Sequence, residues 1–182
     1  MKVYNYKEAY HHLYYILQNK KQDTFIAEIT DTIIHYGPEG GFNIAKAQAM
    51  GIPYYDLQKE GGAMVTSPGD LVYCFTTPVK NSRFNMELRN HLAKKLQARG
   101  INVEQTKNDL LVDGKKCFGF MHRDFGDYVF YGGHISIDCN LPLIQQLCTK
   151  PMEKVPGGLS TYGITTEDVI KWLQEFWFYY KK

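Results

Sequence analysis

Cysteine is scarce in this sequence: the 182 residues include only Cys74, Cys117, Cys139 and Cys148. None of them forms a Cys-x-x-Cys pair or lies at zinc-finger spacing from a histidine, so the usual zinc motifs are excluded and we expect no metal site. Each lies in an apolar or mixed stretch, which indicates reduced thiols. No apolar run is long enough for a signal peptide or a membrane span. We therefore expect a cytoplasmic protein with no membrane partner.

An excess of charge of either sign is also missing, because 21 lysines and arginines stand against 19 aspartates and glutamates, for a net charge of +2. Binding to nucleic acid or to anionic lipid needs a basic excess gathered on one face. Lys94, Lys95 and Arg99 would form a basic helix face, but no aromatic residues that could stack on bases are interleaved with them. We therefore expect no nucleic-acid partner.

Repeats, linkers and low-complexity tracts are absent as well, which favours a single domain over residues 1–182. The residues are 44% hydrophobic and 14% aromatic, which is enough apolar material for a sizeable core. A chain of this length buries roughly 70% of the surface that its unfolded form exposes. The composition therefore argues against intrinsic disorder.

Apolar residues recur at three- and four-residue steps in several segments, which predicts helices. The clearest series runs through Phe84, Leu88, Leu92 and Leu96 and ends at Gly100. The predicted helices span about 6–19 after a cap at Asn5, 43–50 after a cap at Asn43, 83–99 after a cap at Asn81 or Ser82, and the region following a near capping box of Thr165 and Asp168.

Short apolar runs bounded by turn residues predict strands. These runs are 24–29, 32–36, 63–66, 71–76, 110–112, 115–122 and 128–138. The Pro68-Gly69 turn favours a hairpin-like unit of 63–66 with 71–76. Asp113-Gly114 favours a type I′ hairpin, because both central residues of that turn need positive φ. The fold class is therefore α/β or α+β, with a mixed, largely antiparallel sheet and packed helices.

Three segments carry residues that could take part in chemistry. In Gly61-Gly62-Ala63, paired glycines would let backbone N–H groups approach a carboxylate or phosphate, although turn formation alone would also explain them. In the segment 108–119, period-two geometry places Lys116 on one face with Phe118 and Phe120. The Lys116 ammonium could stabilise an oxyanion or phosphate charge, or it could be a solvated lysine at a strand edge.

The third segment is Gly132-Gly133-His134. Its glycine pair predicts either a bulge or a close approach of the backbone by a ligand. A structural histidine with satisfied hydrogen bonds is the default interpretation of His134.

Taken in order and spacing, the three segments resemble the biotin and lipoate protein ligase superfamily, in particular its lipoate ligase and octanoyltransferase branches. The resemblance covers roughly residues 25–178 and depends on the ordered set rather than on one motif. Residues 33–37, residues 43–52 and the Gly61-Gly62-Ala63 turn are similar to the family's strand, helix and glycine-rich lipoyl-binding loop. Residues 108–119 resemble its Asn-Asp, hairpin and Lys-x-x-Gly segment, with Lys116 on the catalytic lysine. The remaining similarities are His134 with 135–141 to its His-Gly strand, and Lys154, 158–160 and 164–169 to its closing loop and helix.

The resemblance implies a two-step ligase. ATP, with Mg, would activate lipoate or octanoate as an acyl adenylate, and a lysine of a lipoyl acceptor domain would attack the activated carbonyl. Lys116 would stabilise the developing charge, and Asp109 would orient the incoming amine. The implied substrate-binding residues are Gly61, Gly62, Ala63, Phe118, Gly119 and His134. The aliphatic chain needs a narrow apolar tunnel, and its expected walls are Val65, Val72, Phe118 and Ile135.

Departures from the family pattern keep other functions open. Family ligases usually carry two arginines before the glycine triplet and a His-Asp pair after it, where this sequence has residues 56–60 and Thr66-Ser67. An octanoyltransferase would instead take the acyl group from an acyl carrier protein through a cysteine thioester, for which Cys148 lies in the right region. A non-catalytic relative that binds an acyl ligand or a lipoyl domain is the alternative of a different class. A biotin ligase fits less well, and we expect no C-terminal accessory domain.

Overall fold

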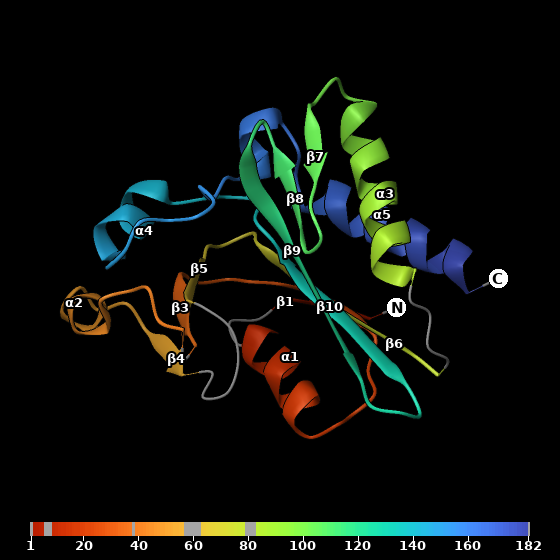
Figure 1. Cartoon of the computed structure of the whole chain (residues 1–182), viewed down its shortest axis with the longest axis horizontal. Coiled ribbons are helices and arrows are strands. Elements are labelled where there is room, and N and C mark those ends of the chain that lie inside the picture. Colours follow the sequence, from red (N-terminus) through yellow and green to blue (C-terminus); the bar gives the residue numbers. More distant parts are fainter. Residues whose placement is uncertain (1, 6–8, 38, 57–62, 79–82, 182) are drawn as a thin grey trace.

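The computed structural model describes residues 2–5, 9–37, 39–56, 63–78 and 83–181, and in this part of the chain helices pack on two β-sheets (Figure 1). The strands are β1 (Lys2–Asn5), β2 (Phe25–Glu28), β3 (Ile33–Tyr36), β4 (Tyr54–Asp56), β5 (Ala63–Thr66), β6 (Leu71–Thr77), β7 (Val103–Gln105), β8 (Asp109–Val112), β9 (Lys115–Asp124) and β10 (Val129–Ile135). The helices are α1 (Ala9–Gln18), α2 (Ile44–Ala49), α3 (Phe84–Gln97), α4 (Leu141–Leu147) and α5 (Thr166–Tyr180), with a short 3-10 helix at Leu159–Tyr162.

The large sheet has the strand order β1-β2-β6-β10-β9-β8-β7, and the small sheet has the order β4-β3-β5. In the large sheet every neighbouring pair is antiparallel except β1 and β2. In the small sheet, β3 pairs in parallel with β4 and antiparallel with β5. The predicted class, a mixed and largely antiparallel sheet with packed helices, is confirmed. The division of the strands into two sheets is not predicted by the sequence.

Helices cover both faces of the large sheet, with α1 on one face and α3 with α5 on the other (Figure 1). Strand β6 shows the consequence, because alternate residues of a strand point to opposite faces. Leu71, Tyr73 and Phe75 pack in the core under α3 and α5, whereas Val72 and Cys74 pack in the core under α1. All five are fully buried, which explains the continuous apolar run in the sequence.

The small sheet packs with α2 and α4 in a third core, whose members include Ile34, Ala47 and Ile144. Helix α2 begins at the predicted cap, where the Asn43 side chain accepts a hydrogen bond from the Lys46 N–H at 2.9 Å. Helix α4, which the sequence analysis does not predict, begins in the same way at Asn140. Both caps satisfy N–H groups that a helix start otherwise leaves without partners.

The predicted hairpin of 63–66 with 71–76 is wrong, because β5 pairs with β3 while β6 pairs with β2 and β10. The turn between β5 and β6 binds the chain that follows β2. Ile29 N–H donates to the Asp70 carbonyl at 2.8 Å, and Gly69 N–H donates to the Ile29 carbonyl at 2.9 Å. These long-range hydrogen bonds fix the turn at which the chain passes from the small sheet to the large sheet.

Most predicted helices agree with the structure. Helix α3 is followed by Gly100 at a φ of +77°, although its predicted caps at 81–82 lie outside the described residues. Helix α5 begins with the predicted capping box of Thr165 and Asp168. Asn5, the predicted cap of the first helix, is instead the last residue of strand β1, a strand that the sequence does not predict. Residues 6–8 lie outside the described part of the chain, and helix α1 is described from Ala9 onward. Among the described residues, no helix has the length and apolar character needed to cross a membrane.

The structure shows the backbone at the two dipeptides that the sequence singles out, Asp113-Gly114 and Gly132-Gly133. Asp113 and Gly114 have φ values of +47° and +76°, which confirms the predicted hairpin turn between β8 and β9. Gly132 and Gly133 form no bulge, since β10 keeps a continuous register with both of its neighbours. A Cβ atom on Gly133 would collide with the Gly119 carbonyl oxygen and with the Tyr73 ring. Protein atoms therefore approach the backbone closely at Gly133.

Candidate functional site

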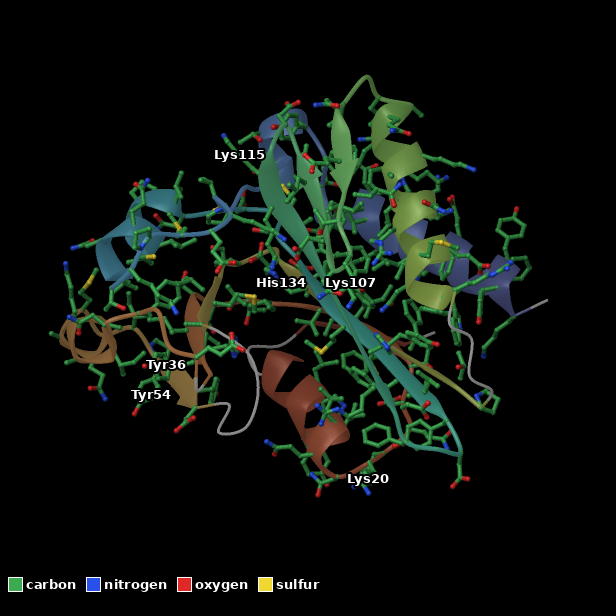
Figure 2. All side chains as sticks on the ribbon, viewed as in Figure 1. Lys20, Tyr36, Tyr54, Lys107, Lys115 and His134 are labelled. Carbon is green, nitrogen blue, oxygen red and sulfur yellow. The ribbon has the colours of Figure 1, made fainter. Side chains whose placement is uncertain are left out.

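A cavity of about 630 Å³ lies between the two sheets. Its walls come from the loop 39–42, residues 63–67, strands β9 and β10, helix α4 and the segment 148–156. Figure 2 shows His134, which lines this cavity, near the middle of the molecule, with Tyr36 and Tyr54 of the small sheet to its left. The side chains that could act on a ligand come mainly from β9, the start of β8 and the segment 148–156.

Lys116 reaches the cavity because strand β9 contains a bulge. Leu110 pairs with Phe118 and the next residue, Leu111, pairs with Lys116, so Cys117 has no partner on β8. Lys116 and Gly119 are three residues apart and would face opposite sides of a regular strand. Here a Cβ atom on Gly119 would lie 3.8 Å from the Lys116 Cε atom. The bulge therefore brings the two residues onto one face.

This arrangement corrects the prediction that Lys116 shares a face with Phe118 and Phe120. Both phenylalanines are buried in the core under α3 and α5, although they also line the cavity. The Lys116 side chain instead is 44% exposed and points its ammonium at a carboxylate. An unbroken period-two reading of β9 could not reveal this, because a bulge shifts the alternation by one residue.

The carboxylate belongs to Asp109, the first residue of β8, whose side chain is only 5% exposed. The Lys116 Nζ atom lies 2.8 Å from Asp109 Oδ1, and the Lys154 Nζ atom donates to Asp109 Oδ2. Burial by itself would raise the pKa of the Asp109 carboxyl, but the hydrogen bonds from the two lysines outweigh burial and lower it. Asp109 is therefore an ionised carboxylate held between two ammonium groups.

Hydrogen bonds on both sides hold the backbone at the start of β8, where Asp109 lies. Asp109 N–H donates to the Thr106 hydroxyl at 3.1 Å, and Thr106 N–H donates to the Asp109 carbonyl at 3.0 Å. On the other side, Phe120 N–H donates to the Asn108 carbonyl at 2.8 Å. The Asn108-Asp109 pair therefore has a fixed position beside Gly119, its partner residue in the β8–β9 pairing.

Lys154 arrives from a segment that runs beside β9 at the bulge. Lys116 N–H donates to the Val155 carbonyl at 2.8 Å, and Gly157 N–H donates to the Lys116 carbonyl at 3.0 Å. A Cβ atom on Gly157 would lie 2.7 Å from the Lys115 Cβ atom, so this close approach requires glycine. The segment therefore holds the Lys116 backbone and delivers Lys154 to the same carboxylate.

Lys154 is not among the site residues that the sequence predicts. It lies in a segment whose only signal is the similarity to the family's closing loop. Its contact with Asp109 joins residues 45 positions apart, and neither periodicity nor spacing can indicate such a contact.

His134 lies at the cavity with its imidazole backed by Asp70. The His134 Nε2 atom lies 3.1 Å from Asp70 Oδ2. The buried Asp70 carboxylate also accepts the N–H groups of Ser67 at 2.9 Å and Ile137 at 2.7 Å. Asp70 therefore joins the turn after β5 to the end of β10 and holds the His134 ring from behind.

Three of the four cysteines line the cavity. Burial raises the pKa of the Cys117 thiol to about 12 and that of the Cys139 thiol to about 11. Burial also raises the pKa of Cys148, the candidate for a thioester. Since the thiolate is the nucleophile, all three environments disfavour nucleophilic attack by sulfur.

The structure brings most of the predicted site residues together. Those that line the cavity are Ala63, Asp109, Lys116, Phe118, Gly119, His134 and Cys148. Gly61 and Gly62 lie outside the described residues. Among the described residues, no group of three or more His, Cys, Asp or Glu side chains could hold a metal ion.

Two of the four residues expected to form the walls of an acyl tunnel line this cavity. Val65 and Phe118 line the cavity. Val72 and Ile135, the other two, do not line it. Val72 lies in the core under α1 and Ile135 in the core under α3 and α5, because helices cover both faces of the large sheet.

One protein family and several solved structures are similar to this chain. The family model described as lipoyl protein ligase A/B catalytic domain matches residues 13–176. No curated protein matches the chain. Among solved structures, P. falciparum LipL1 in complex with lipoate is similar with a TM-score of 0.76 at 15% identity, covering 100% of this chain. This chain spans only 60% of the length of LipL1.

Two further structures have similar folds. The bi-partite lipoate protein ligase of Thermoplasma acidophilum, described with its E2 lipoyl domain, has a TM-score of 0.72 at 13% identity, over 96% of this chain and 80% of that one. Lipoate-protein ligase A bound with ATP has a TM-score of 0.75 at 14% identity, over 96% of this chain and 83% of that one. At these identities the likeness concerns the fold.

Proposed function

The chain belongs to the family of lipoyl protein ligase A/B catalytic domains, and from this membership we propose that it transfers a lipoyl or octanoyl group to a lysine of an acceptor domain. One observation carries the proposal. The lysine of the Lys-x-x-Gly segment, Lys116, lies at a cavity between the two sheets and contacts the buried Asp109. Two of the similar structures contain lipoate or ATP, and a third is described with its E2 lipoyl domain, which supports the same ligands and partner here.

The cavity has room for a medium-length acyl chain. Apolar contacts from Val65, Phe118 and Ile144 would hold the chain, and the Lys116 ammonium would lie at its carboxyl end. ATP, with Mg, would supply the chemical activation of that carboxylate by converting it into a mixed anhydride with AMP and releasing pyrophosphate. A preorganised cation at the reacting carbonyl contributes several kcal/mol to transition-state stabilisation.

In the transfer step, the neutral ε-amine of an acceptor lysine attacks the activated carbonyl. A new amide bond forms, the bond to the phosphate oxygen breaks, and AMP and a proton leave. Lys116 would stabilise the charge on the carbonyl and phosphate oxygens. Both Asp109 oxygens are occupied by lysines, so the part we propose for Asp109 is to position Lys116. Orienting the incoming amine would require one of the lysines to move away.

A non-catalytic acyl-binding protein is the second candidate, and one feature of the cavity supports it. None of the described residues that line the cavity is an arginine, the side chain best suited to bidentate binding of phosphate groups. The lysines Lys116, Lys150 and Lys154 are the cations among them. Transfer through a Cys148 thioester is disfavoured by its raised pKa.

The test is intact mass spectrometry of a lipoyl acceptor domain incubated with this protein. One reaction contains lipoate, ATP and Mg, and a second contains octanoyl acyl carrier protein. A mass gain in the first reaction supports a ligase, and a gain in the second alone supports a transferase. No gain in either reaction, with protein that shows cooperative unfolding, would reject acyl transfer and favour the binding protein.

A further inference from the structure

Two lysines share the buried carboxylate at the cavity, but the proposed transfer uses only Lys116. The Lys116 and Lys154 side chains are 44% and 39% exposed, whereas that of Asp109 is 5% exposed. One buried negative charge therefore lies between two cations that both reach the cavity surface. The cluster of Asp109, Lys116 and Lys154 carries a net charge of +1.

The two ammonium groups keep hydrogen-bonding capacity beyond Asp109. Each has three N–H donors, and its contact with Asp109 is to a single oxygen, Oδ1 for Lys116 and Oδ2 for Lys154. Both Asp109 oxygens are occupied, so the carboxylate itself offers little to a ligand. What the cluster presents to the cavity is a pair of cations, fixed side by side by a shared counter-ion.

The position of Lys154 is determined by backbone contacts, which distinguishes it from an ordinary surface ion pair. Lysines in exposed pairs lose side-chain entropy on ordering and gain little stability. Here the adjacent residue, Val155, accepts a hydrogen bond from the Lys116 N–H at 2.8 Å. The backbones of the two lysine segments are therefore joined next to the point where their side chains meet.

The other charged groups of the cavity wall do not form a comparable site. Glu39, Asp138 and Glu153 also line the cavity, and their negative charges would repel an anion. Lys150 donates to the Glu39 carbonyl at 3.1 Å, so its ammonium is bound to the loop 39–42 and not to Asp109. An anion entering the cavity therefore meets its strongest attraction at the cluster.

We propose that Lys154 is a second anion-binding residue, which together with Lys116 binds the carboxylate of the acyl substrate. This inference rests on the proposed function, and it adds to that function a residue that contacts the substrate. The two lysines are adjacent because both contact Asp109. Each ammonium can therefore donate a hydrogen bond to one oxygen of the substrate carboxylate. Such charge-assisted hydrogen bonds are about twice as strong as neutral ones.

The test compares a charged ligand with a neutral ligand of the same length. Binding of octanoate and of octanamide is measured by calorimetry for the wild type, Lys154→Met and Lys154→Arg, with Lys150→Met as the matched control. Lys154→Met is expected to weaken octanoate binding about tenfold and to leave octanamide binding unchanged. Lys154→Arg keeps most of the octanoate affinity, and Lys150→Met resembles the wild type.

Some results would overturn the role of Lys154 without rejecting the proposed function. Equal weakening of both ligands in Lys154→Met would mean that Lys154 only supports the cavity wall, and the inference would fall. Unchanged octanoate binding in this variant would also overturn it. If Lys154→Met does not fold, the ratio of the two affinities in Lys154→Arg and Lys154→Gln decides in the same way. A wild type that binds neither ligand would remove the inference, whereas acyl transfer to an acceptor domain would still uphold the proposed function.

Discussion

The Lys116 side chain lies against the backbone of Gly119, with 3.8 Å between the Lys116 Cε atom and the position that a Gly119 Cβ atom would take. The two residues can meet only because the bulge at Cys117 shifts the alternation of β9. The Lys-x-x-Gly spacing is therefore a geometric unit, in which the glycine leaves room for the lysine and the bulge turns the lysine toward the cavity.

This contact predicts graded effects of side chains at position 119. Gly119→Ala is expected to be close to the wild type, because 3.8 Å is an ordinary van der Waals distance. Gly119→Val would displace Lys116 and lower acyl transfer about 10- to 100-fold, since small misplacements of a reacting group are costly. Transfer rates and urea unfolding of both variants test this. Equal activity of Gly119→Val and the wild type would show that the contact does not position Lys116.

Replacement of Lys116 itself should have the largest effect on transfer. Lys116→Ala is expected to lower the rate about 100-fold or more, the loss typical for removal of one group that stabilises an oxyanion. Lys115→Ala is the matched control, because the neighbouring lysine is exposed and does not line the cavity. The measurement is acylation of the acceptor domain over time. A Lys116→Ala variant as fast as the Lys115→Ala control would contradict the assigned role.

Asp109 predicts a pH dependence of stability. Burial raises its pKa, but hydrogen bonds from Lys116 and Lys154 outweigh burial, so the folded pKa lies below the unfolded value of about 3.9. A lowered folded pKa contributes stability above the unfolded pKa, and this contribution is lost as the pH falls through the folded pKa. Wild-type protein should therefore lose more unfolding free energy than Asp109→Asn as the pH falls from about 5 to below the unfolded pKa of about 3.9. Urea unfolding across this range tests the prediction, and parallel curves for the two proteins would refute it.

Asp70 is expected to contribute to the stability of the fold as well as to contact His134. Its carboxylate is 1% exposed and accepts the N–H groups of Ser67 and Ile137 as well as contacting His134. Asp70→Ala would leave these buried donors without partners and lower the unfolding free energy by about 3 kcal/mol. Asp138→Ala, at an exposed carboxylate, is the control. A loss below about 1 kcal/mol in Asp70→Ala would contradict the structural role.

Replacement of Cys148 is expected to leave acyl transfer nearly unchanged. Burial raises the pKa of its thiol, so little thiolate is available near neutral pH. Cys148→Ser is therefore expected to keep the transfer rate within about twofold of the wild type, because a thiol that is not ionised contributes no nucleophile. The acylation assay with octanoyl acyl carrier protein measures this. Detection of an octanoyl adduct on Cys148 by peptide mass spectrometry would reinstate the thioester route.

The sequence by itself determined those features that depend on neighbours along the chain. The capping box of Thr165 and Asp168, the cap at Asn43 and the Asp113-Gly114 turn are all present where the pattern predicts them. Caps and turns close hydrogen bonds between residues two to four positions apart. Such contacts can be recognised from residue type and spacing, and so can an ordered set of family segments.

Only the tertiary structure decided how those pieces pair and what they place together. Strands β5 and β6 are adjacent in sequence, yet they join different sheets because the turn between them binds Ile29. Asp109 and Lys154 meet across 45 positions. The bulge at Cys117, which turns Lys116 to the cavity, exists only in the pairing of β9 with β8. Each of these features depends on partners far apart in the chain, which no local pattern specifies.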